Sequence, residues 1–210
     1  MVRVGNMTKE LYIAVVALAF VGVVSAIQRT SLLAQSVPLT DFFNGRFAQH
    51  PVLTLLHILP GLIFCILGPL QFATKIRRNY PTFHKWSGRV YVVAGIFIGI
   101  SALILVYVLG LAGIAETVNV TLFASLFLIF LGLAVYRIRR REVAAHREWM
   151  IRAFALGLAS ASLRLIFLIV TAVSDFSFAE SFLIALWISF PLHLVIAELW
   201  IIIGRRSRVE

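Results

Sequence analysis

The chain has 210 residues, of which 61% are hydrophobic and only 13% are charged, and its mean hydropathy is +0.98. Soluble domains are usually about half apolar and a quarter charged, so this composition excludes a soluble globular protein. The formal net charge of +10 would suggest a nucleic-acid partner in a soluble protein. Here every Lys and Arg except Arg29, Arg46 and Arg164 falls in segments expected on one side of a membrane. Membrane orientation therefore explains the charge, and we expect no nucleic-acid partner.

Several apolar runs exceed the roughly 20 residues that are needed to cross a bilayer. The first run lacks a convincing A-x-A-like cleavage site, which favours a transmembrane helix over a signal peptide. We expect one integral-membrane domain over residues 1–210, an all-α, polytopic membrane helix bundle in contact with the lipid bilayer. Its six transmembrane helices are expected at about 11–28, 51–73, 88–111, 118–136, 149–173 and 182–203.

Two basic loops, at residues 74–87 and 137–148, follow the second and fourth predicted helices. Loops rich in Lys and Arg lie on the cytoplasmic side of a membrane protein. The pattern therefore predicts a multi-pass protein of the cell membrane with both termini in the cytoplasm. Four acidic residues are expected on the outside: Asp41, Glu116, Asp175 and Glu180.

The two basic loops share a short pattern. The triplet Ile-Arg-Arg occurs at 76–78 and again at 138–140, and a histidine follows each isoleucine by eight residues, giving His84 and His146. A glycine lies eleven residues beyond each histidine, at Gly95 and Gly157. We interpret this as a parallel helical-hairpin repeat of helices two–three and four–five, related by an axis along the membrane normal. Convergence is the alternative, because cytoplasmic loops are basic in any case.

Three ionisable side chains fall in the outer half of the predicted membrane region. His57, Arg164 and His193 lie roughly 9, 14 and 17 Å from the outer ends of their helices, at 1.5 Å per residue. Such groups are expensive in hydrocarbon and mark function by default. One interpretation is structural, with Arg164 bound to backbone carbonyls and serines and holding helices together. The other is a pocket that opens to the outside and holds an anionic group, such as a haem propionate, a quinone oxygen or a lipid head group.

Small residues share a helix face with several of these groups. Gly61 and Gly68 follow His57, Gly95 and Gly99 follow His84, and Gly157 follows His146. Small residues at such spacing are typical of close helix packing in membranes. The alternative is that a flat macrocycle lies against the glycines while a histidine on that face ligates its iron.

His84 and His146 are the candidate metal ligands. If the repeat is real, the two histidines approach its axis at the cytoplasmic ends of helices three and five, as a bis-histidine haem or a shared phosphate would require. Alternatively, each histidine would lie at the membrane interface and bind lipid head groups together with its arginine neighbours.

The segment 50–170 resembles an uncharacterised family of predicted bacterial multi-pass membrane proteins with a domain of unknown function. The resemblance rests on H-P-x(5)-H at 50–57, G-P-L-Q-F at 68–72, P-x-x-H-K-W-S-G-R-V-Y at 81–91 and H-R-E-W-M-I-R at 146–152. It implies no established activity. The chain is more distantly similar to ascorbate-type di-haem cytochromes b, a similarity that implies an inner haem pair at His84 and His146. An outer pair is not matched, because Asn119 stands where the repeat would place a partner for His57.

We therefore expect a b-type haem electron-transfer protein with bis-histidine ligation, which exchanges electrons with a quinone or another redox protein. His57, Arg164 and His193 would line a second site. The alternatives are a transporter or lipid-binding protein that uses Arg164 and the membrane histidines, and a non-catalytic membrane scaffold. Hydrolase motifs such as H-E-x-x-H are absent from the sequence.

Overall fold

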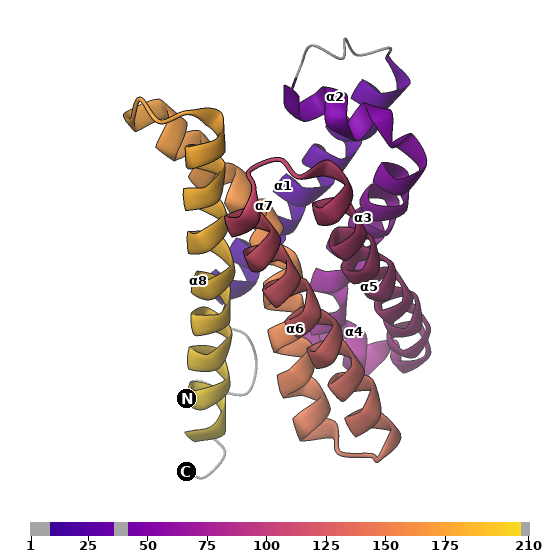
Figure 1. Cartoon of the computed structure of the whole chain (residues 1–210). Coiled ribbons are helices and arrows are strands. Elements are labelled where there is room, and N and C mark those ends of the chain that lie inside the picture. The colour runs from indigo at the N-terminus through magenta and orange to yellow at the C-terminus, as the bar shows by residue number, and fades with distance from the viewer. Residues whose placement is uncertain (1–8, 36–41, 207–210) are drawn as a thin grey trace.

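The computed structural model describes residues 9–35 and 42–206, and within these ranges all regular structure is helical (Figure 1). The helices are α1 (Lys9–Ala34), α2 (Phe42–Gln49), α3 (Pro51–Phe72), α4 (Thr74–Asn79), α5 (Pro81–Leu109), α6 (Ile114–Arg139), α7 (Val143–Val173) and α8 (Phe178–Arg206). Six of these described helices, all except α2 and α4, are long and apolar enough to cross a membrane. The prediction of an all-helical protein with six candidate spans is confirmed.

Five of the long helices form a closed ring. In order around it, α1, α3, α5, α6 and α7 each pack against the next, and α7 returns to α1. Helix α8 lies outside the ring against α7 and α6, while α2 covers one end beside α1 and α3. We call the end that holds α4 and the α6–α7 turn the basic end, and the end that holds α2 the opposite end.

An aromatic cluster fills the centre of the ring. The Phe64 ring on α3 stacks on Tyr91 of α5, with 4.3 Å between the centroids, and meets Phe127 of α6 and Phe154 of α7 at 5.7 and 6.0 Å. All four side chains are buried. One residue from each of four neighbouring helices therefore closes the core between the two ends of the bundle.

The glycine faces lie against this cluster and its neighbours. A methyl group built on Gly157 would overlap the Phe64 ring, and one on Gly68 would overlap Phe154. On α5, a methyl group on Gly95 would lie 2.8 Å from Cδ2 of Leu131. Side chains therefore fill the space beside these three glycines, so no macrocycle lies against them, and the glycines serve close helix packing. Gly61 differs, because no side chain lies within 4 Å of its added methyl group.

Both basic loops are shorter than predicted. Helix α5 begins at Pro81 instead of about residue 88, with the proline in the first turn, where its missing N–H costs nothing. The second loop is reduced to a turn between α6 and α7, in which Arg137 pairs with Glu142 at 2.6 Å and Arg141 has a φ of +63°. The predicted 29–50 connection contains α2. Hydropathy marks where the chain leaves lipid, whereas backbone hydrogen bonds continue a helix beyond that point.

The helical-hairpin repeat and the orientation of the termini remain predictions. His84 and His146 are each the fourth residue of their helix, and their N–H groups donate to the capping residues Tyr80 and Glu142 at 3.0 and 2.9 Å. The two hairpins differ, however, because α4 is present in the first alone. Three residues used in the orientation argument lie outside the described ranges: Arg3, Asp41 and Arg208.

Candidate functional site

His146 lies in the first turn of α7, at the basic end, with its ring fixed by a backbone group. Its Nδ1 lies 2.8 Å from the carbonyl oxygen of Ala134 on α6. A carbonyl accepts only, so Nδ1 carries the proton and the neutral ring keeps its lone pair on Nε2. A backbone carbonyl behind a histidine is a common way to orient the ring as a metal ligand.

His84 occupies the corresponding position on α5 but lacks that support. Its Nδ1 is buried and has no hydrogen-bond partner among the described residues. At the spacing of the repeat, the counterpart of Ala134 is Phe72, the last residue of α3, whereas Ala134 lies well inside α6. The ring interacts electrostatically with Arg77 and with His146. The two predicted ligands therefore lie within electrostatic range of each other, and one of them has an unused ring nitrogen.

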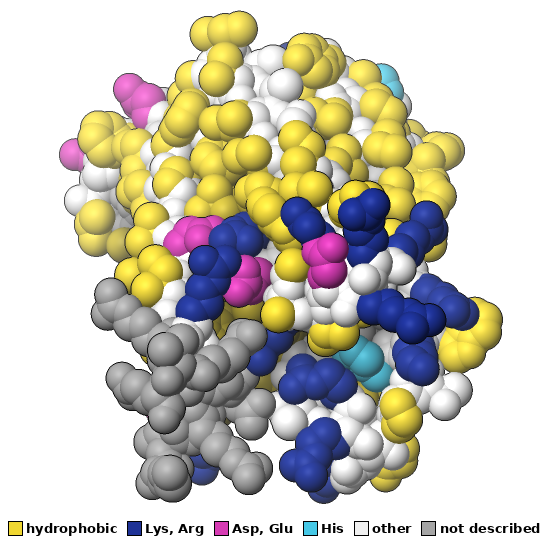
Figure 2. Space-filling model, turned by 90° about the horizontal axis from the view of Figure 1, so that it is seen from below, with side chains coloured by type: hydrophobic (Ala, Val, Ile, Leu, Met, Phe, Trp, Pro, Cys, Tyr) yellow, Lys and Arg dark blue, Asp and Glu magenta, His cyan; other side chains and the backbone are white. Residues whose placement is uncertain are grey.

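Basic side chains surround this pair of histidines. Figure 2 shows Lys and Arg gathered on the face seen from below, beside apolar side chains. Several of the guanidinium groups lie over aromatic rings: for example, Arg89 lies 4.5 Å from the centroid of Trp86, and Arg140 lies 5.1 Å from that of Tyr136. Cation–π contacts of this kind hold the charges at the surface while leaving N–H donors exposed. The basic end is suited to attract anionic groups.

The two other predicted histidines are held by serines of neighbouring helices. His57 Nδ1 on α3 lies 2.9 Å from Ser101 Oγ on α5, and His193 Nε2 on α8 lies 2.6 Å from Ser162 Oγ on α7. Each bond joins a different pair of adjacent helices. These are the contacts expected of structural interhelical hydrogen bonds.

Arg164 is exposed on α7, and its hydrogen bond is local. Its Nη1 donates to the carbonyl oxygen of Ser160, 2.6 Å away on the same helix. The predicted bond to a backbone carbonyl is therefore present, but the idea that this bond holds two helices together is wrong. Ser162, the other expected partner, bonds instead to His193. Arg164 also interacts electrostatically with His57 and Cys65 on α3.

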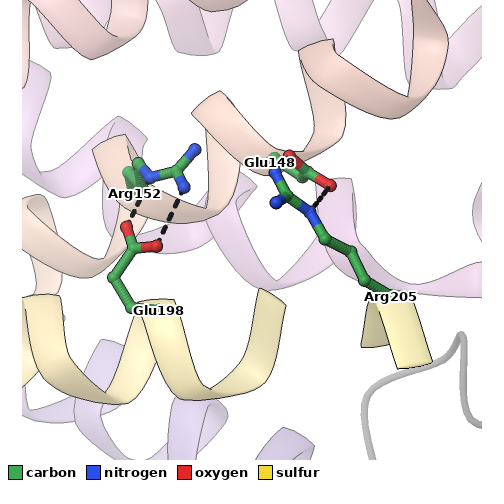
Figure 3. Close-up of polar contacts among 4 residues, drawn as sticks. All are labelled: Glu148, Arg152, Glu198 and Arg205. Carbon is green, nitrogen blue, oxygen red and sulfur yellow. Dashed lines mark hydrogen bonds and ion pairs between the residues drawn. The ribbon is translucent and has the colours of Figure 1, made fainter. Parts of the chain in front are cut away.

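Two ion pairs that the sequence analysis missed join α7 to α8 (Figure 3). The side chains of Arg152 and Glu198 face each other with two hydrogen bonds, and Arg205 reaches Glu148 in the same way. The partners are 46 and 57 residues apart in the chain, so no local pattern reveals them. The available signal was that acidic and basic residues share the same predicted depth on helices five and six.

The described residues contain no group of three or more His, Cys, Asp or Glu side chains placed to hold a metal ion. Two imidazoles alone suit a metal that brings its other ligands with it, as haem iron does.

Comparison with known proteins identifies the family. A family model described as "Predicted membrane protein (DUF2306)" matches residues 54–201. The chain belongs to this family. The match spans α3 to α8 nearly completely and includes four of the five ring helices. It contains the candidate site residues His57, His84, His146, Arg164 and His193. It establishes a membrane protein and assigns no activity. No curated protein and no solved structure matches the chain.

Proposed function

We propose that the protein is a membrane cytochrome of b type that holds one haem between His84 and His146 at the basic end. The observation that carries the proposal is the state of the two rings. His146 is oriented by the Ala134 carbonyl so that Nε2 is available, and His84 has a buried ring nitrogen with no partner.

The residues around the pair suit this group. A haem with two imidazole ligands supplies one-electron transfer. Arg77, within electrostatic range of His84, would offset the charge of a propionate, as would the neighbouring basic residues. Tyr91 and Phe154 close the apolar side toward the core and exclude water from it. The electron donor or acceptor would be a quinone or another redox protein, and the basic end would face the cytoplasm of a cell membrane.

The proposal is limited to one haem. His57 and His193 are each engaged with a serine, which supports a structural role for both. In addition, α6 contains no histidine that would pair with His57. A second site lined by these residues and Arg164 is not needed for electron transfer at the basic end.

The test is a redox difference spectrum. The protein would be produced in cells supplied with haem, purified in mild detergent, and its oxidised and dithionite-reduced spectra recorded. A sharp reduced band in the b-type region is expected, and it should be lost in His84→Ala and in His146→Ala. His193→Ala is the matched control and should keep the band. A featureless spectrum from folded wild-type protein would overturn the proposal.

A further inference from the structure

Arg164 is placed where a charged side chain is expensive. It lies nine residues from Val173 at the end of α7, or roughly 14 Å at 1.5 Å per residue. The side chain is exposed on the surface of the protein, and α7 is one of the six candidate spans. A guanidinium stays protonated and costs several kcal/mol at membrane depth unless it is paired or hydrated. Stabilising this guanidinium therefore requires a hydrogen-bond acceptor or a negative charge from a molecule outside the described protein.

The described residues supply few hydrogen-bond acceptors and no carboxylate to the Arg164 guanidinium. A guanidinium has five N–H donors, and the hydrogen bond of Arg164 uses Nη1 for the Ser160 carbonyl. The three ion pairs among the described residues belong to other arginines: Arg137, Arg152 and Arg205. The groups within electrostatic range, His57 and Cys65, are an imidazole and a thiol, and neither is a carboxylate. Arg164 therefore keeps unused donors and an uncompensated charge.

The direction of the Arg164 side chain shows that it does not extend to the nearer membrane interface to be solvated there. A long basic side chain near a helix end usually extends toward the nearer interface, where water and head groups solvate it. Arg164 instead donates to Ser160, one turn closer to the basic end, so its head group points toward the middle of the bilayer. An acceptor for the remaining N–H groups of Arg164 must therefore bind at the depth of the guanidinium itself.

The local packing leaves a place for that acceptor. Helices α1, α3 and α7 meet tightly just below Arg164: a methyl group built on Gly22 would lie 2.7 Å from Cys65 Sγ and 4.0 Å from Cβ of Ala161. Ala161 is one turn from Arg164 on α7, so the arginine lies at the edge of this closed seam. Leu165, Leu168 and Ile169, on the following turns, are exposed and apolar. A charged group beside an apolar surface suits a molecule that is itself amphiphilic.

We propose that Arg164 binds the anionic head group of a membrane amphiphile, whose phosphate or carboxylate oxygens accept hydrogen bonds from the guanidinium. Two sources offer this chemistry, an acidic phospholipid and a free fatty acid. The site is separate from the histidine pair at the basic end and does not depend on haem.

The test measures lipid retention by native mass spectrometry of the full-length protein in mild detergent. Phosphatidylglycerol, phosphatidylcholine and oleate, with matched chains, are added separately to the wild type, Arg164→Gln and Arg78→Gln, where Arg78 is a basic-end control. We expect the wild type and Arg78→Gln to retain phosphatidylglycerol, oleate or both about fivefold better than phosphatidylcholine, and Arg164→Gln to show a clearly smaller preference, with only the attraction of the basic end remaining. Preference for phosphatidylglycerol alone would identify a phospholipid site, and preference for oleate alone a fatty-acid site.

A wild type that does not distinguish anionic from neutral lipid would overturn the proposal, as would a folded Arg164→Gln protein with the preference intact. Thermal unfolding of each variant shows whether it is folded. If Arg164→Gln fails to fold, Arg164→Lys keeps the charge with fewer donors and should show a reduced but measurable preference, whereas an unchanged preference would contradict a site built on the guanidinium. Because the readout is bound lipid, this result is independent of the redox spectrum.

Discussion

Arg152 on α7 and Glu198 on α8 form a two-pronged ion pair, with Nε 2.5 Å from Oε1 and Nη2 2.9 Å from Oε2. The Arg152 side chain is 14% exposed and the Glu198 side chain 45%. The guanidinium also lies 4.6 Å from the centroid of Trp149. Helix α8 lies outside the ring, so this pair is one of the contacts that fix it to the rest of the bundle.

Removing one partner of this pair should destabilise the protein. Glu198→Gln leaves the largely covered Arg152 charge without its carboxylate, and we expect a loss of about 1–3 kcal/mol in the free energy of unfolding. Thermal unfolding in detergent measures it. Glu142→Gln is the control, because its partner Arg137 is 38% exposed and can be solvated, so this change should cost less than about 1 kcal/mol. Equal losses in the two variants would show that burial of Arg152 is not decisive.

Close packing at Gly157 predicts a second effect on stability. Gly157→Ala places a methyl group into the Phe64 ring, and the required shift of the aromatic cluster should cost about 1–3 kcal/mol. Gly132→Ala on α6 is the control, since nothing lies within 4 Å of its added methyl group and alanine favours a helix. Thermal unfolding should show a lower midpoint for Gly157→Ala and an unchanged or higher midpoint for Gly132→Ala.

The interhelical bond between His193 and Ser162 predicts a measurable coupling. A double-mutant cycle with His193→Ala and Ser162→Ala should give a coupling energy of about 0.5–1.5 kcal/mol, the range found for hydrogen bonds between membrane helices. Chemical unfolding in mixed micelles is the measurement. Additive effects of the two substitutions would mean that the 2.6 Å contact contributes nothing to stability.

The basic end predicts the orientation of the protein in its membrane. Two new cysteines report on opposite ends: Arg140→Cys in the α6–α7 turn and Asp175→Cys in the exposed α7–α8 connection. In intact cells, a membrane-impermeant maleimide should label position 175, whereas position 140 should react only after permeabilisation. The native Cys65 is buried and should give little background. Labelling of position 140 in intact cells would contradict the predicted orientation.

Hydropathy alone predicts the six spans, because length and apolarity are properties of each segment. The helix ends were placed less well. Pro81 is an available signal for the start of α5, whereas the low hydropathy before residue 88 predicts a later start. The basic residues in this stretch predict a loop, but in the structure they belong to two helices, α4 and the first turns of α5.

The candidate site was predictable in its members but not in its contacts. The shared position of His84 and His146 follows from spacing in the chain. Their different hydrogen bonding does not, because it depends on where α3 ends relative to α6. The same limit applies to Arg152 and Glu198, which meet only because α7 and α8 pack at one particular rotation. Contacts between helices require three-dimensional register, which a single sequence does not contain.

The length of α7 bears on where its histidine, His146, lies relative to the membrane surface. A helix of 31 residues rises about 46 Å, while the hydrocarbon core of a bilayer is about 30 Å thick. The excess has to be absorbed by tilt or by turns that extend into the head-group layers. Where turns of α7 extend beyond the core, His146 in the first turn lies at the level of water and lipid phosphates. A redox or anion-binding centre at this level would be tuned by membrane surface charge and by ionic strength, and a centre in the aromatic core would not be.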